Sequence, residues 1–301
     1  MASLPRKECF VEVPGGKVWC LVVGENDKIP LIVLHGGPGY PHDYLEPLQL
    51  LGSFRTVIFY DQLGCGKSDR PAEQSLWRIP RFVEELRIVC ERFAPGGAHV
   101  LGHSWGTILA LEFALKMPQL LKSAIFASPC ISIPRWEADS HLLRRKLPQA
   151  LQFVLHQCEK EGDFQSTEYQ LATLEYYKRF VYGMAELPEY VGKANEGFSP
   201  EVYHKMWGPN EFFVQGTLAH YDNREGLAKL SVPSLFTCGR EDEATPEATR
   251  WYQELTPHAQ LAVFENSAHM PHITEAAAYR SLLDEFMNRV ERGEGDGVQY
   301  A

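Results

Sequence analysis

The stretch Gly102-His103-Ser104-Trp105-Gly106 decides how this chain folds. It is a G-x-S-x-G motif, preceded by the short apolar run 98–101 and followed by the helix-forming run 107–117, which stops at Pro118. Strand, tight turn and helix form the context of a nucleophile elbow. The flanking glycines let the chain turn sharply while the serine adopts a strained conformation. The motif therefore predicts that Ser104 is a nucleophile, and a plain glycine–serine turn is the alternative.

Composition and charge restrict the possible functions of this protein. The chain has 301 residues, of which 45% are hydrophobic and 23% charged, so it has ample material for a globular core. Its formal net charge of −10 argues against nucleic acid as a partner. No apolar run approaches the ~18 residues of a membrane span, and residues 1–8 do not resemble a signal peptide.

The cysteines indicate the cellular compartment. The chain has 7 cysteines, an odd number, and no C-x-x-C pair, so neither a disulfide framework nor a zinc site is indicated. We therefore expect a cytoplasmic protein with reduced thiols, without a metal ion and without a cofactor.

Strands and helices are expected to alternate on both sides of the motif. Before it, 8–13 and 17–23 have the pattern of a hairpin, whereas 31–34 and 56–60 are apolar runs typical of buried strands. An amphipathic helix is expected over 79–93, and a further buried strand over 123–128. This alternation predicts an α/β fold with a mostly parallel twisted sheet flanked by helices.

The pattern changes in the middle of the chain. Between about 133 and 230 no buried strand is evident, and helical stretches such as 142–161 and 168–184 take its place. The α/β pattern then resumes with strands over 232–238 and 261–264 and a closing helix over 276–289; the tail from Arg292 is expected to be loose. We therefore expect a core in two parts, 1–132 and 231–301, with an inserted helical cap, 133–230.

A glycine-rich loop, His35-Gly36-Gly37-Pro38-Gly39, follows the strand expected over 31–34. In hydrolases with a nucleophile elbow, the loop in this place supplies one backbone donor of the oxyanion hole. We assign that role to Gly37, with Gly36 as the alternative, and the second donor to the backbone N–H of Trp105. The competing interpretation is a simple glycine-rich turn.

A serine needs a base to accept its proton, and the base needs a third group to orient it. In proteins with this elbow the acid and then the histidine follow the serine, each after a strand. Asp242 is the expected acid, with Glu241 and Glu243 as alternatives. His269 is the expected base because it lies closer to its strand than the alternative, His272. The hypothesis is acyl transfer to the serine, with the histidine as general base and then general acid.

These motifs together resemble the proline iminopeptidase family of α/β-hydrolases, and the resemblance spans nearly the whole chain. It implies the α/β-hydrolase fold, the same catalytic triad, and two glutamates that bind the free α-amino group of the substrate. On matching positions these glutamates are Glu211 in the cap and Glu243 beside the acid. The resemblance rests on the following segments: 35–39, Asp61-Gln62, 102–106, 208–212, 239–246 and 267–269.

The implied activity is removal of an N-terminal amino acid from short peptides or amino acid amides. Two carboxylates in a partly dry pocket are suited to binding a terminal ammonium group by charge-assisted bonds. The family often has arginine at the position of Leu63 and glycine at that of His103, so the preferred first residue stays open between proline and another, often apolar, residue. An esterase or amidase of non-peptide substrates is the alternative within enzymes, and a non-catalytic ligand-binding protein is the alternative outside them. The sequence does not indicate an oligomeric state.

Overall fold

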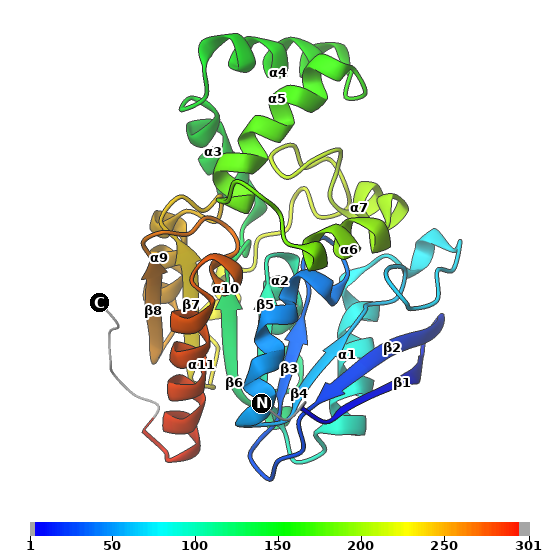
Figure 1. Cartoon of the computed structure of the whole chain (residues 1–301), viewed down its shortest axis with the longest axis vertical. Coiled ribbons are helices and arrows are strands. Elements are labelled where there is room, and N and C mark those ends of the chain that lie inside the picture. The colour runs from blue at the N-terminus through cyan, green and yellow to red at the C-terminus, as the bar shows by residue number, and fades with distance from the viewer. Residues whose placement is uncertain (1–3, 295–301) are drawn as a thin grey trace.

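The structure, a computed structural model, describes residues 4–294. Its centre is an eight-stranded sheet with the strand order β1-β2-β4-β3-β5-β6-β7-β8 (Figure 1). The first pairings, β1 with β2 and β2 with β4, are antiparallel, and the remaining pairings are parallel. The predicted α/β fold class is thereby confirmed. The strands are β1 Arg6–Val13, β2 Gly16–Val23, β3 Leu31–Leu34, β4 Val57–Tyr60, β5 Ala98–His103, β6 Leu121–Ala127, β7 Ser234–Gly239 and β8 Ala259–Phe264.

The sheet is buried on both faces. In β3 every residue is buried, with Ile32 and Leu34 in one hydrophobic cluster and Leu31 and Val33 in the other. This alternation is the two-residue period of a strand, and burial on both sides explains why β3 and β4 are apolar throughout. Three helices cover the first face: α1 Ile79–Phe93, α2 Trp105–Lys116 and α9 Pro246–Leu255. The second face is covered by α11 Ala276–Glu291 and the 3₁₀ segment His42–Ser53.

A group of helices lies between β6 and β7 in the sequence and above one end of the sheet in space (Figure 1). It comprises α3 Ile133–Arg144, α4 Gln149–Glu161, α5 Thr167–Tyr177, α6 Glu189–Gly197 and α7 Pro200–Met206. The short α8 Arg224–Leu227 follows them in the sequence and contacts α2 and α9. In the described part of this region, extended pairing is limited to isolated bridges. The division at 132/133 and 230/231 remains a prediction.

Two helices expected in this region begin and end differently. The stretch 142–161 is not one helix, because α3 ends at Arg144 and α4 begins after Pro148. Proline has no N–H to donate, and it disfavours helical geometry in the residue before it. The stretch 168–184 is α5 followed by a π-helical turn, Lys178–Tyr182, which ends at Gly183 in a left-handed conformation.

The last described residue is Glu294. Most of the tail that was expected to be loose therefore lies outside the described residues. Within residues 4–294, no helix combines the length and the apolar character that crossing a bilayer requires.

Candidate active site

Ser104 is held in a strained turn between β5 and α2. Its backbone angles are φ 55° and ψ −123°, outside the regions that a serine ordinarily adopts. The turn requires small neighbours: a Cβ at Gly102 would lie 2.1 Å from the carbonyl oxygen of Gly106, and a Cβ at Gly106 would lie 2.6 Å from that of Leu34. The two glycines of the motif are therefore needed for close backbone packing, and the serine is forced outward.

Asp242 and His269 form a buried hydrogen-bonded pair. Nδ1 of His269 lies 2.7 Å from Oδ1 of Asp242, on loops that follow β7 and β8. An ionised carboxylate only accepts hydrogen bonds, so Nδ1 is the donor and Nε2 is left free to accept a proton. The alternatives for these positions are arranged differently, since His272 makes no such bond to Asp242 and Glu241 is half exposed.

The carboxylate of Asp242 is fixed by three further donors. Its Oδ2 accepts hydrogen bonds from Oγ of Ser128 (2.7 Å) and from the N–H of Gly239 (3.2 Å), and its Oδ1 accepts one from the N–H of Ala244 (2.7 Å). Four donors, counting His269, satisfy both oxygens. Such a carboxylate can hold the imidazole in one tautomer and one orientation.

The π-helical turn Lys178–Tyr182 of the cap is attached to both loops that carry this pair. The N–H of His269 donates to the carbonyl of Val181 (3.2 Å), and the N–H of Glu243 donates to the carbonyl of Phe180 (3.2 Å). Consecutive carbonyls of one irregular turn therefore anchor the histidine and the glutamate that follows Asp242. A π-turn is a frequent feature of functional sites.

Glu243 is a buried carboxyl group with little compensation, since only the nearby hydroxyl of Tyr176 opposes the rise of its pKa. Among the described residues, neither of its side-chain oxygens has a hydrogen-bond partner, and Oε1 lies 4.0 Å from Nε2 of His269. Burial raises the pKa of Glu243 well above its usual range, and the carboxylates of Glu211 and Asp242 raise it further. Buried polar groups without partners are rare in proteins, which makes Glu243 a candidate contact for a bound group.

Glu211 is held by its backbone at the edge of the same region. Its carbonyl accepts hydrogen bonds from the indole N–H groups of Trp136 (2.7 Å) and Trp207 (3.3 Å), and its N–H donates to the hydroxyl of Tyr177 (3.2 Å). Desolvation raises the pKa of Glu211, while the charge of His269 opposes that shift. The side chain is thus directed by a rigid aromatic frame.

The glycine-rich loop lies against the serine. The N–H of Gly36 is already engaged, since it donates to the hydroxyl of Tyr44 (2.8 Å). Gly37 has φ 106°, a conformation that suits glycine. The N–H of Trp105 belongs to the first residue of α2, where helical N–H groups have no partner within the helix. This arrangement favours Gly37 over Gly36 as the donor from the glycine-rich loop.

One pocket brings most of the expected residues together. It has a volume of about 270 Å³, and its lining includes Ser104, His269, Glu211, Gly36 and Gly37. Asp242 and Glu243 are not part of this lining and are buried. Most of the remaining lining is aromatic or aliphatic: Tyr40, Tyr44, Tyr177, Val181, Tyr182, Phe198, Tyr203, Pro209 and Met270.

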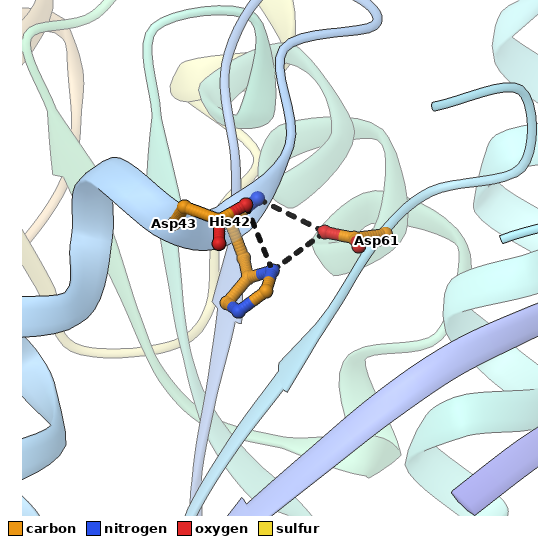
Figure 2. A group of neighbouring side chains, drawn as sticks. All are labelled: His42, Asp43 and Asp61. Carbon is orange, nitrogen blue, oxygen red and sulfur yellow. Dashed lines mark hydrogen bonds and ion pairs between the residues drawn. The ribbon is translucent and has the colours of Figure 1, made fainter. Parts of the chain in front are cut away.

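Figure 2 shows His42, Asp43 and Asp61, the one group in residues 4–294 whose donor atoms lie close enough together to hold a metal ion. The oxygens of Asp61 are occupied by protein donors. Oδ1 of Asp61 accepts from the N–H (3.0 Å) and from Nδ1 (2.7 Å) of His42, and its Oδ2 accepts from the N–H of Lys67 (2.9 Å). These contacts give the cluster a structural role in fixing the loop after β4.

Sequence reasoning missed three residues that position this site: Tyr44, Ser128 and Trp136. Their partners lie 8–141 residues away in the chain, so no local pattern signals them. Ser128 alone carries a weak signal, because it follows directly after an apolar strand, at the edge of the sheet where the elbow also lies.

Comparison with known proteins places this geometry in context. Residues 29–276 match the family model described as alpha/beta hydrolase fold. A proline iminopeptidase of Heyndrickxia coagulans is 45% identical over 94% of this chain and 99% of its own length. The crystal structure of a proline iminopeptidase from Mycobacterium smegmatis superimposes with a TM-score of 0.89 at 31% identity, covering 95% of this chain and 99% of that one. The crystal structure of VinJ gives a TM-score of 0.91 at 30% identity, covering 94% and 99%.

Proposed function

This chain belongs to the proline iminopeptidase family of α/β-hydrolases, and we propose that it is a serine aminopeptidase that removes one N-terminal residue through an acyl-enzyme on Ser104. That the chain is a hydrolase follows from the family itself. Its relatives bear the name proline iminopeptidase, which supports an N-terminal proline, or another apolar residue, as the group removed. The largely apolar pocket supports the same substrate class.

The observation that carries this proposal is the poorly compensated carboxyl group of Glu243 beside Nε2 of His269. A cation at this position would favour the ionised form of Glu243, and the α-ammonium group of a peptide is a cation two bonds from the carbonyl carbon to be attacked. Together with Glu211, which lines the pocket, Glu243 would give the substrate ammonium two carboxylates. Such a site selects for a free N-terminus and excludes internal peptide bonds.

The chemistry then proceeds in two halves. Oγ of Ser104 attacks the carbonyl carbon while its proton passes to Nε2 of His269, and the oxyanion is bound by the N–H groups of Gly37 and Trp105. His269 gives the proton to the leaving nitrogen, the C–N bond breaks, and the shortened peptide departs. A water molecule repeats the sequence, giving its proton to His269, and releases the free amino acid and Ser104. Asp242 holds the imidazole and stabilises its cationic form throughout.

The cellular location proposed for this enzyme is the cytoplasm. All seven cysteines of the chain are free thiols in the structure. Reduced thiols are usual in the cytoplasm, whereas disulfides persist in oxidising compartments.

The test is steady-state hydrolysis of prolyl, alanyl, leucyl and phenylalanyl arylamides, each with a free and with an acetylated amine. We expect turnover to require the free amine and Ser104, so that Ser104→Ala abolishes it. Glu211→Gln should raise KM by on the order of tenfold or more, because a charge-assisted bond is replaced by a neutral one. Glu241→Gln is the matched control, since this half-exposed glutamate faces Arg179 on the surface.

Each result decides between named functions. Equal turnover of acetylated compounds or simple esters would overturn the ammonium site and identify an esterase or a general amidase. Failure of Ser104 to react with a fluorophosphonate, together with no turnover of any compound, would identify a ligand-binding protein.

A further inference from the structure

His103, the residue before the proposed nucleophile, is buried and uses both ring nitrogens. Nε2 lies 2.8 Å from the carbonyl oxygen of His269, and Nδ1 lies 2.8 Å from the hydroxyl oxygen of Tyr44. A carbonyl oxygen can only accept a hydrogen bond, so Nε2 carries the proton. Nδ1 of the neutral ring is then an acceptor, and the hydroxyl of Tyr44 must donate to it. Burial lowers the pKa of His103 well below its usual range, which keeps the ring neutral.

The same reasoning determines the next bond. Since the hydroxyl of Tyr44 gives its hydrogen to His103, its oxygen is free to accept, and it accepts from the N–H of Gly36 (2.8 Å). The result is a directed chain: Gly36 N–H to Tyr44 O–H to His103, and His103 Nε2–H to the carbonyl of His269. All four residues are buried.

We propose that His103 is a positioning residue that connects the oxyanion loop to the loop of the catalytic histidine. The inference rests on the roles of Ser104 and His269 proposed above. The backbone at Gly36 lies so close to the serine that a Cβ there would be 3.1 Å from Cβ of Ser104. The distance from the proposed oxyanion donor of this loop to the serine therefore depends on the hydrogen bond between Tyr44 and Gly36. The position of His269 depends in part on the hydrogen bond that its carbonyl accepts from His103.

The chain is one of several contacts that hold His269, besides Asp242 and the carbonyl of Val181. The carbonyl oxygen of His269 also lies 3.2 Å from Oγ of Ser128, whose single hydrogen is directed mainly to Asp242 in the shorter bond of 2.7 Å. Loss of His103 therefore leaves the histidine partly supported. We expect a partial loss of rate, since misplacement of a catalytic group by about 1 Å can lower the rate by about a hundredfold.

Two substitutions separate positioning from packing. His103→Phe keeps an aromatic ring and removes both hydrogen bonds. His103→Gln can place an amide N–H near the position of Nε2 and so restores the bond to the carbonyl of His269. We expect kcat for a prolyl arylamide to fall by on the order of tenfold to a hundredfold in the Phe variant, with KM changed less than about threefold. The Gln variant should recover part of this loss.

Tyr44→Phe provides a second variant if His103→Phe does not fold. It removes the hydroxyl that joins Gly36 to His103 and should lower kcat by a smaller factor, again at nearly constant KM. If both substitutions lower the melting temperature but leave kcat at its wild-type value at 25 °C, the role of His103 is structural and the proposal is overturned. A loss confined to KM, or a Gln variant as slow as the Phe variant, would overturn it too.

Two further measurements do not need the proposed substrate. Imidazole ¹⁵N shifts of the wild-type protein at pH 7 should show His103 protonated at Nε2 and unprotonated at Nδ1, and the opposite tautomer would overturn the proposal. Labelling of Ser104 by a fluorophosphonate should be slower in His103→Phe than in the wild type. If labelling slows while the wild type hydrolyses no aminoacyl arylamide, the positioning role stands and the aminopeptidase proposal fails; an unchanged labelling rate overturns the positioning role itself.

Discussion

Oε1 of Glu243 lies 4.0 Å from Nε2 of His269, and within residues 4–294 neither side-chain oxygen of Glu243 accepts a hydrogen bond. A buried carboxylate without partners destabilises the folded state, because it loses hydration that nothing in the protein replaces. Binding of a cation at this point would supply the missing interaction. Stability and activity are therefore expected to respond in opposite directions to changes at Glu243.

Glu243→Gln should stabilise the free protein at pH 8 and weaken substrate binding. The folded-state pKa of Glu243 is raised, so as pH rises above 4.5 the unfolded chain releases this proton before the folded one does, and stability falls. Glu243→Gln has no such titrating group, so the difference in melting temperature between this variant and the wild type should grow from pH 4.5 to pH 8. Each kcal/mol corresponds to about 2–4 °C in melting temperature. Thermal unfolding at both pH values, with Glu241→Gln as control, measures it; a lower melting temperature for Glu243→Gln at pH 8 would contradict it.

Asp242→Asn should lower kcat by about 10³–10⁴-fold with little change in KM, because the amide no longer fixes the required tautomer or stabilises the imidazolium. An amide oxygen in the place of Oδ2 keeps the bonds from Ser128 and Gly239, whereas the bond from Ala244 to Oδ1 is lost, so the fold should persist. Steady-state kinetics with near-UV circular dichroism checks both points. A variant retaining more than a tenth of wild-type kcat would exclude Asp242 as the orienting acid.

Trp136→Phe should raise KM by about 2–10-fold, the usual effect of one neutral hydrogen bond, and leave kcat nearly unchanged. The ring of Trp136 packs edge-on against that of His269, and Phe retains this contact, whereas the N–H to the carbonyl of Glu211 is lost. Trp207→Phe is the matched control: its bond to the same carbonyl is longer, 3.3 Å against 2.7 Å, so its effect should be smaller. If both substitutions lower kcat to the same extent, the two indoles do not act by positioning Glu211.

Glu291→Gln should reduce the free energy of unfolding by about 1–3 kcal/mol at pH 7 and leave kcat unchanged. Glu291 accepts hydrogen bonds from buried Arg55 (2.6 Å) and from His99 (3.2 Å), at the end of α11 far from the cap (Figure 1). The bond from His99 and the charge of Arg55 lower the pKa of Glu291 to about 2. Its stabilising effect is therefore full above pH 4.5 and is lost as pH falls towards 2.

Urea unfolding at pH 7 and pH 3 measures this effect. The difference in unfolding free energy between the wild type and Glu291→Gln should be smaller at pH 3. A difference that stays constant between the two pH values would show that the charge of Glu291 does not contribute.

Local sequence patterns were enough to predict several elements closely. The bounds of β3 and α1 coincide with the apolar run 31–34 and the amphipathic run 79–93. A strand buried on both faces is apolar at every position, and a helix buried on one face has apolar residues at a helical period, so both elements can be recognised in the sequence. The helix expected over 142–161 was wrong for a reason also present in the sequence, since Pro148 separates α3 from α4. Both outcomes depend on interactions within a few residues.

The sequence by itself determined the α/β fold class, the elbow that presents Ser104, and the order in which the candidate triad residues follow one another, because these depend on local geometry and on hydrophobic period. Only the tertiary structure decided between neighbouring residues of like chemistry. Glu241 is half exposed, whereas Glu243 is buried beside His269. The N–H of Gly36 donates to the hydroxyl of Tyr44, whereas the N–H of Gly37 does not take part in this hydrogen bond. The physical reason is that burial and hydrogen bonding at these positions come from the cap and from loops far away in the chain, and no pattern in the adjacent residues records them.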